Sequence, residues 1–303
     1  MDYVLKTENL TKVYGKSKVV NQVNMNVKKG DIYGFIGKNG AGKTTFMRMV
    51  AGLAAPTNGR IELFGSEELE KQRKRMGTLI EHPGLYPHMT ARENLEVVRR
   101  NLGITDKNVV DDMLEFVGLS NTNRKKVKNF SMGMKQRLGI GISLLRNPDF
   151  LILDEPINGL DPAGIREVRE LLLKLNQERE ITILISSHIL GELSKIATRY
   201  GIIRDGVLIE EFETEELVER CRRCQKLVVN DVERAIGILE ETLHISNYDV
   251  PQDGVLRVFE CLEETERVNR ELISGGVDIK ESYLAGQDLE GYFMDLLGGK
   301  ENV

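Results

Sequence analysis

Cysteine is scarce in this sequence, which excludes a small secreted domain held together by disulfide bonds. Only three cysteines occur among the 303 residues, and disulfide-rich domains use more. Cys221 and Cys224 form a C-x-x-C pair, but a zinc site needs four ligands and Cys261 is the one cysteine left. The pair lies in the stretch ELVERCRRCQ, which is typical of the end of a charged helix. We therefore expect incidental thiols here, not a metal site or a redox pair.

Long apolar runs are also absent. The longest, 150–153 and 181–185, have the length of strands, whereas a membrane-spanning helix needs about 20 apolar residues. The first ten residues, MDYVLKTENL, include an acid and no apolar core, so they do not resemble a signal peptide. The net charge of −5 does not favour a nucleic-acid partner. We expect a globular, cytoplasmic protein that is held at a membrane only through a partner.

The first two thirds of the chain alternate between strand-like and helical segments. This alternation predicts an α/β fold, a largely parallel sheet with helices on its faces. Two N-terminal strands that end at Gly15 and Gly30 predict an added antiparallel sheet. Asn58-Gly59 is a turn signal. Further strands are expected at 31–37, 60–65, 150–154 and 181–187, with helices at 44–53 and 163–178 and a mostly helical region from 67 to 145 that is broken at Pro83, Pro87 and Gly103.

The pattern changes near residue 215. Strand-like and helical segments then follow in the order strand, helix, strand, strand, helix, strand, ending with an amphipathic segment at 288–299. This order is the split βαβ pattern of ferredoxin-like domains. We therefore predict two domains, 1–214 and a small α+β domain at 215–303.

A phosphate-binding loop occupies residues 37–44. The sequence GKNGAGKT fits G-x-x-x-x-G-K-[ST] and lies between a predicted strand and a predicted helix. Glycines let backbone N–H groups turn toward a phosphate, and the helix N-terminus adds its positive end. In such loops Lys43 reaches the β- and γ-phosphates and the Thr44 hydroxyl ligates Mg²⁺. The loop predicts a nucleoside triphosphate site, which many unrelated proteins share.

Two acids end the apolar strand FLILDE. At a strand end beside the phosphate loop, Asp154 can hold Mg²⁺ and Glu155 can polarise the attacking water as a general base. An Asp-Glu pair alone is more often a solvated strand end. Four preceding apolar residues, and a position about 110 residues beyond Lys43, favour the functional interpretation.

Together with these motifs, the segment FSMGMKQR at 130–137 resembles the signature LSGGQ-x-x-R of ABC transporter nucleotide-binding subunits. Pro156 and the turn 158–161 resemble the loop that communicates between paired sites, and Ser131 also suits a helix N-cap. The resemblance covers about 4–214 and implies an ABC-type P-loop ATPase with a mixed sheet, an antiparallel β subdomain and a helical subdomain. It implies ATP contacts from Tyr14, Gly37, Asn39, Gly40, Gly42, Lys43, Thr44, Thr45, Ser131, Gly133 and Asp161, catalytic roles for Glu155 and His188, and Mg²⁺ ligation by Thr44, Asp154 and Glu81.

Three residues depart from the family pattern. Met132 and Met134 replace a glycine and the glutamine of the signature, while Ser131 and Gly133 remain. Glu81 stands where the family places a glutamine, so it keeps oxygen ligands but adds a negative charge. This substitution and the C-terminal domain are similar to those of the bacitracin-resistance and lantibiotic-immunity exporters.

The resemblance also implies partners. Two subunits would face head to tail, with ATP between Lys43 of one and Ser131 and Gly133 of the other, and the loop 81–96 would receive a short helix of a separate membrane subunit. The expected function is ATP hydrolysis that powers export of a peptide antibiotic or a similar amphiphile, at the inner face of the membrane. A soluble ABC ATPase acting on nucleic acid or the ribosome, and a regulatory module that binds ATP without turnover, are the alternatives.

Overall fold

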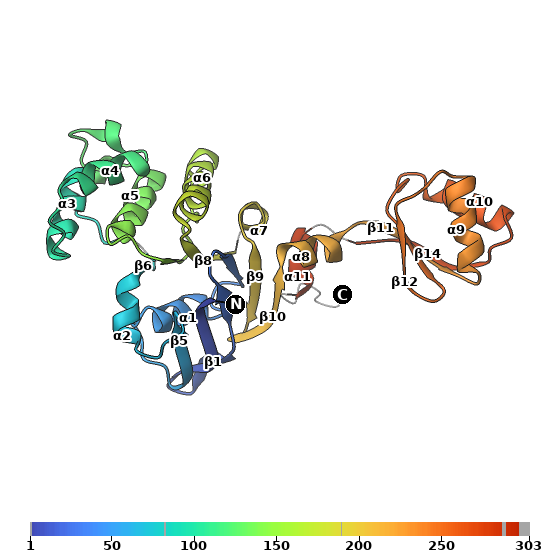
Figure 1. Ribbon diagram of the computed structural model, residues 1–303, viewed down its shortest axis with the longest axis horizontal. Helices are drawn as coiled ribbons and strands as arrows, with labels where there is room; N and C mark the ends of the chain where they lie inside the picture. Colours follow the sequence, from blue (N-terminus) through green and yellow to red (C-terminus); the bar gives the residue numbers. More distant parts are fainter. Residues whose placement is uncertain (1, 82, 189, 287–288, 297–303) are drawn as a thin grey trace. The chain divides into compact units, whose positions relative to one another are not determined.

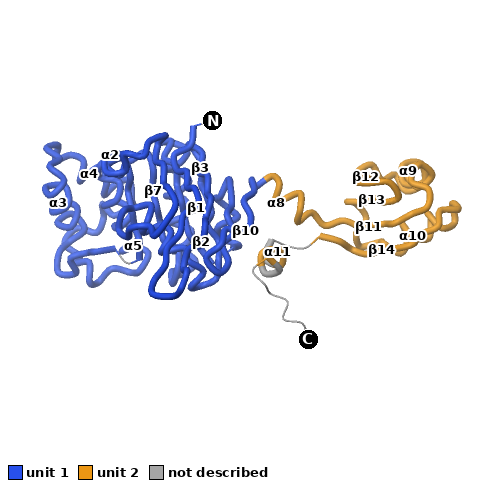
Figure 2. The backbone as a smooth tube through the Cα atoms, turned by 90° about the horizontal axis from the view of Figure 1, so that it is seen from below, with its two compact units in different colours: residues 1–214 blue, residues 215–303 orange. Residues whose placement is uncertain are grey.

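The computed structural model describes residues 2–81, 83–188, 190–286 and 289–296. The chain divides into two compact units, 1–214 and 215–303 (Figure 2). Part of the amphipathic segment predicted at 288–299, namely 288 and 297–299, lies outside the described residues. In the part of the chain that is described, no helix has the length and apolarity needed to cross a membrane.

A six-stranded sheet is the centre of the first unit (Figure 1). Its strand order is β10-β9-β4-β8-β7-β6, and all neighbours are parallel except β10 and β9. The strands β4, β7 and β8 are wholly buried and rich in apolar residues, as expected for parallel strands with both faces covered. The strands are β4 (Ile32–Ile36), β6 (Met76–Leu79), β7 (Phe150–Leu153), β8 (Thr182–Ser187), β9 (Arg199–Arg204) and β10 (Val207–Glu213).

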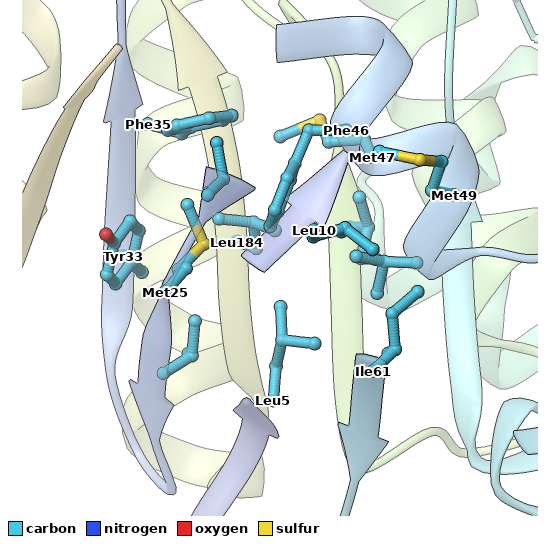
Figure 3. Packing of buried hydrophobic residues seen from close by; sticks show 14 of the residues in the cluster. Leu5, Leu10, Met25, Tyr33, Phe35, Phe46, Met47, Met49, Ile61 and Leu184 are labelled. Carbon is cyan, nitrogen blue, oxygen red and sulfur yellow. The ribbon is translucent and has the colours of Figure 1, made fainter. Parts of the chain in front are cut away.

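A smaller antiparallel sheet packs against this centre. Strand β1 (Tyr3–Tyr14) pairs with β2 (Ser17–Val23), β3 (Asn26–Lys28) and β5 (Asn58–Leu63). Helix α1 (Lys43–Val50) buries its apolar side chains in the core that this sheet shares with the central sheet. Figure 3 shows Phe46, Met47 and Met49 of this helix gathered with side chains of both sheets. This core fixes the start of α1 relative to β4.

Helices fill most of the chain between β6 and β7. Helices α3, α4 and α5 pack together there (Figure 1). A capping box at Thr90 and Glu93 starts α3, since each side chain accepts the other's backbone N–H. The remaining helical segments of the unit are α2 (Leu69–Gln72), η1 (Arg73–Arg75), α3 (Ala91–Asn101), α4 (Asn108–Phe116), η2 (Ser120–Thr122), η3 (Val127–Asn129), α5 (Met132–Leu144), α6 (Pro162–Arg179) and α7 (Leu190–Leu193).

One local prediction is wrong. The expected turn at Asn58-Gly59 lies inside β5, where Asn58 pairs with Thr11. Gly59 has a φ of 89°, and a Cβ there would lie 2.4 Å from the Asn9 carbonyl oxygen, so this glycine permits a close approach of two strands. The region predicted to be mostly helical also contains β6, because its four residues gain their strand pairing from β7, far along the chain.

The second unit forms a four-stranded antiparallel sheet with the strand order β12-β13-β11-β14. Its elements follow the predicted order of strand, helix, strand, strand, helix, strand, and the inner faces of α9 and α10 bury leucines and valines against the sheet. The ferredoxin-like assignment stays a prediction. The elements are α8 (Thr214–Cys221) at the boundary, β11 (Cys224–Val229), α9 (Val232–Glu241), β12 (Tyr248–Gln252), β13 (Val255–Val258), α10 (Thr265–Ser274), β14 (Ile279–Ala285) and α11 (Leu289–Leu296).

The C-x-x-C pair spans the end of α8 and the start of β11. Cys221 and Cys224 are buried, and burial raises the pKa of the Cys224 thiol. Among the described residues, no three His, Cys, Asp or Glu side chains are grouped as a metal site. These observations agree with thiols that pack in the core.

Candidate functional site

The glycine-rich loop leaves the carboxyl end of β4 and opens directly into α1. Gly40 and Gly42 have φ values of 83° and 108°, which favour glycine. A Cβ on Gly42 would lie 2.5 Å from the Val19 carbonyl oxygen, and one on Gly37 would lie 2.5 Å from that of Ile203. The loop is therefore closely packed, and its backbone curves around the start of a helix.

Lys43 is a buried cation inside this loop. Its side chain is 6% exposed, and its Nζ donates to the Gly37 carbonyl oxygen at 2.6 Å. The same Nζ lies 3.2 Å from Oε1 of Glu155. A buried ammonium needs such partners. A phosphate oxygen, like the carboxylate oxygen that Lys43 faces here, is a negatively charged acceptor. The geometry therefore suits an anion.

Asp154 lies between two hydroxyl groups at the end of β7. The Thr44 hydroxyl donates to its Oδ2 at 2.7 Å, and the buried Ser186 hydroxyl donates to its Oδ1 at 2.6 Å. Thr44 and Asp154 thus place two hard oxygen ligands together beside the phosphate loop, and such ligands fit Mg²⁺.

Glu155 is held from three sides. Its φ of 49° is unusual for a residue other than glycine, and its N–H donates to the Ser186 hydroxyl at 2.8 Å. Nδ1 of His188 lies 2.7 Å from Oε2 of the carboxylate, while Lys43 faces Oε1. The predicted base, the predicted histidine and the phosphate-loop lysine thus lie in one connected group.

The signature segment begins helix α5. The Ser131 hydroxyl accepts from the Met134 N–H at 3.3 Å, as expected of an N-cap. Gly133 is buried, and a Cβ there would lie 3.3 Å from the Cα of Gly164 in α6. Asp161 caps α6 by accepting from the Gly164 N–H at 3.0 Å. Ser131 and Asp161 are thus occupied as caps at the starts of two adjacent helices.

A cavity of about 760 Å³ is lined by residues from the end of β7 and from the start of α5. Asp154 and Glu155 line it, together with Glu81 and with Met132 from the start of α5. The expected γ-phosphate side of the site and the signature helix therefore open onto the same space within one chain.

The other predicted residues lie around the loop. Tyr14, at the end of β1, is 50% exposed, with Lys12 Nζ 4.9 Å from its ring centroid. Asn39 is exposed at the loop tip, and Thr45 is half-buried beside Thr44. Their contacts with nucleotide stay predictions.

Glu81 lies beside a cation of helix α1. It has a φ of 66°, and its carboxylate pairs with the guanidinium of Arg48 in α1. The structure thus brings Glu81 to a cation, and its role as a Mg²⁺ ligand stays a prediction.

Sequence reasoning missed Ser186 and Arg48. Ser186 lies one residue before the end of strand β8, which is parallel to β7, and the carboxyl ends of adjacent parallel strands meet at one edge. That rule was enough to place Ser186 beside Asp154. Arg48 had no such signal, because its partner lies 33 residues away in a loop.

The chain is similar to known proteins in sequence and in fold. The ABC transporter family profile matches residues 20–158. The bacitracin transport ATP-binding protein BcrA of Bacillus licheniformis is 45% identical over 302 residues, 99% of each chain. The lantibiotic transport ATP-binding protein SrtF of Streptococcus pyogenes is 47% identical over 210 residues, which are 69% of this chain and 91% of that protein.

Two solved structures agree with the fold of the first unit. CbiO1 of Clostridium perfringens, part of the ABC transporter complex cbiONQ, superimposes with a TM-score of 0.66 at 25% identity, covering 80% of this chain and 97% of that chain. The ATP-binding cassette MJ0796, a dimer bound to ADP and Pi, gives a TM-score of 0.63 at 25% identity, covering 69% and 98%. The predicted ABC-type α/β fold is confirmed. By its full-length relatives and its fold, the chain belongs to the ABC transporter ATP-binding proteins, and it is an ATPase that uses ATP and Mg²⁺.

Proposed function

We propose that the chain hydrolyses ATP at the Lys43–Asp154–Glu155 site and thereby powers a bacterial exporter of a bacitracin-like peptide antibiotic. The observation that carries the site assignment is the connected group of Lys43, Glu155 and His188 beside the Thr44–Asp154 oxygen pair. The cargo assignment rests on the full-length likeness to BcrA, which is named for bacitracin transport.

The chemistry follows from what each side chain can do. Lys43 exchanges Glu155 for phosphate oxygens when ATP arrives, which frees the carboxylate. Glu155 then accepts a proton from the attacking water, and His188 keeps its carboxylate oriented. Thr44 and Asp154 hold Mg²⁺, which, when bound, offsets the negative charge of the phosphates.

A second copy supplies the other half of the site. The free N–H groups at the start of α5 point out of a capped helix end, where the helix dipole favours an anion. Ser131 and Gly133 of one copy would meet the ATP held by Lys43 of the other. ATP adds contacts only in the closed dimer, so it shifts the equilibrium toward closure.

The membrane partner is a separate subunit. This part of the proposal rests on the likeness to BcrA and SrtF, which are named as transport ATP-binding proteins. We place this chain at the inner face of the membrane, bound to a permease through the loop 81–96.

Resistance and copurification test the proposal together. A host that lacks the chain but keeps its own membrane proteins receives wild type, Glu155→Gln or the surface control Glu178→Gln. Glu178 lies on α6 and pairs only weakly with Lys174, at 3.9 Å. Wild type and the control should restore bacitracin resistance and copurify a multi-span protein, and Glu155→Gln should copurify it without resistance.

Other outcomes separate the two parts of the proposal. If wild type copurifies a permease but never changes bacitracin resistance, the cargo assignment is wrong and the transporter assignment stands. If only ribosomes or soluble factors copurify, the transporter assignment is wrong.

A further inference from the structure

Helix α1 supplies a cation to a third carboxylate next to the site. Asp154 and Glu155 have partners at the start of this helix, as described above. One turn further along, the Arg48 guanidinium pairs with Glu81. All three carboxylates line the same cavity.

The helix geometry places this pair close to the expected metal. Thr44 and Arg48 are four residues apart and therefore share one face, about 6 Å apart along the axis. Both are partly exposed, while Phe46 and Met47 between them are buried in the core. Arg48 therefore faces the loop side of the helix, where Glu81 lies.

The charge at position 81 creates a physical problem. Asp154 and Glu155 already present two carboxylates to a site that must receive a phosphate chain. A third carboxylate would repel ATP, or would compete for Mg²⁺ with the ligands that the site already has. A neutral glutamine would offer an oxygen ligand without repelling ATP.

We propose that Arg48 is a positioning residue that neutralises Glu81 and holds its carboxylate away from the Thr44–Asp154 oxygen pair. The inference rests on the proposed ATP site. The left-handed backbone of Glu81, with φ 66°, restricts where its side chain can point. A second nearby cation, Lys43, acts on a different group, since it pairs with Glu155, to which His188 also bonds.

Stability is not the role of this pair. The two side chains are 39% and 56% exposed, and exposed ion pairs contribute little to folding. Arg48 also lies in the last turn of α1, where a cation suits the helix dipole. A purely structural Arg48 would act through that dipole and would not depend on Glu81, and this difference can be tested.

The experiment titrates the purified full-length chain with a fluorescent ATP analogue. Wild type, Arg48→Met, Arg48→Lys, Glu81→Gln and the double variant are compared in EDTA and then with increasing Mg²⁺. In EDTA at low salt, Arg48→Met should bind about threefold more weakly, since a freed carboxylate beside the site repels the phosphates. In the presence of Mg²⁺ it should bind the metal more tightly, because the freed carboxylate adds an oxygen ligand.

Two rescue variants test whether the effect of Arg48 depends on Glu81. Arg48→Lys keeps the charge and should resemble wild type, and the double variant should return to wild-type affinity within about twofold. Both effects should weaken at high salt. The inference is wrong, while the ATP site stands, if Arg48→Met changes neither the affinity for the ATP analogue nor that for Mg²⁺. It is also wrong if adding Glu81→Gln to Arg48→Met does not restore these affinities. If wild type binds no nucleotide, the proposed function itself fails, and the inference fails with it.

Discussion

Replacing Ser186 with alanine removes one buried hydroxyl that holds both acids of the site. That hydroxyl donates to Asp154 Oδ1 at 2.6 Å and accepts from the Glu155 N–H at 2.8 Å. The side chain is fully buried, so water does not replace it. The variant leaves a carboxylate oxygen and a backbone N–H without their partner.

The cost follows from these two bonds. A hydrogen bond to a charged group contributes about 1.5–3 kcal/mol, and an orphaned buried N–H costs about 1–3 kcal/mol. We therefore expect a loss of about 3 kcal/mol in the free energy of unfolding of the first unit. For a unit of this size, that loss lowers the unfolding temperature by roughly 6–12 °C.

Activity should fall as well. The Glu155 backbone sits at an unusual φ of 49°, and Ser186 fixes its N–H, so the variant displaces the carboxylate from its place beside His188. A displacement of about 1 Å costs up to roughly 100-fold in turnover.

Calorimetry and a phosphate-release assay measure both effects. The matched control is Ser143→Ala in α5, whose hydroxyl donates only to the Ile140 carbonyl of its own helix. The control should stay within about 0.5 kcal/mol of wild type. An unfolding temperature of Ser186→Ala within about 1 °C of wild type, with unchanged turnover, would refute the reasoning.

Three further predictions test other parts of the molecule. Glu155→Gln should bind ATP, lose at least about 100-fold in hydrolysis and accumulate as a dimer by light scattering; a monomer at saturating Mg-ATP contradicts this. Tyr14→Ala should weaken fluorescent-ATP binding by roughly threefold to tenfold through lost stacking, and unchanged affinity would remove its adenine role. Burial raises the pKa of Glu211, which accepts from the Tyr33 hydroxyl at 2.7 Å. Its contribution to stability is therefore present at low pH and is lost as pH rises through the raised pKa. The unfolding temperature of Glu211→Gln minus that of wild type should therefore increase as pH rises from about 4 to about 8. A difference that does not change with pH would contradict this.

Features encoded by neighbouring residues were predictable. The order of strand, glycine-rich loop and helix around Lys43 is local, and so is the cap that Ser131 provides for α5. The same reasoning could have found the β9–β10 hairpin. Its two-residue turn, Asp205-Gly206, has φ values of 51° and 80°, and Asp-Gly between strands is a strong hairpin signal.

Features that depend on distant contacts were not predictable. Strand β6 has only four residues and is defined by its pairing with β7, in which Met76 lies opposite Phe150. The pairing of Arg48 with Glu81 depends on how a loop folds back over α1. Neither contact leaves a signal within a short window of sequence. The β6–β7 pairing forms only when the sheet assembles, and the Arg48–Glu81 pair forms only when the loop folds over α1.

The most direct test of the central claim is steady-state phosphate release from Mg-ATP by the purified chain, compared with Glu155→Gln and with the surface control Glu178→Gln. Our account predicts turnover in wild type and the control, and a loss of at least about 100-fold in Glu155→Gln with ATP binding retained. Equal rates in wild type and Glu155→Gln would contradict it, because hydrolysis would then not depend on the carboxylate that Lys43 and His188 hold in place.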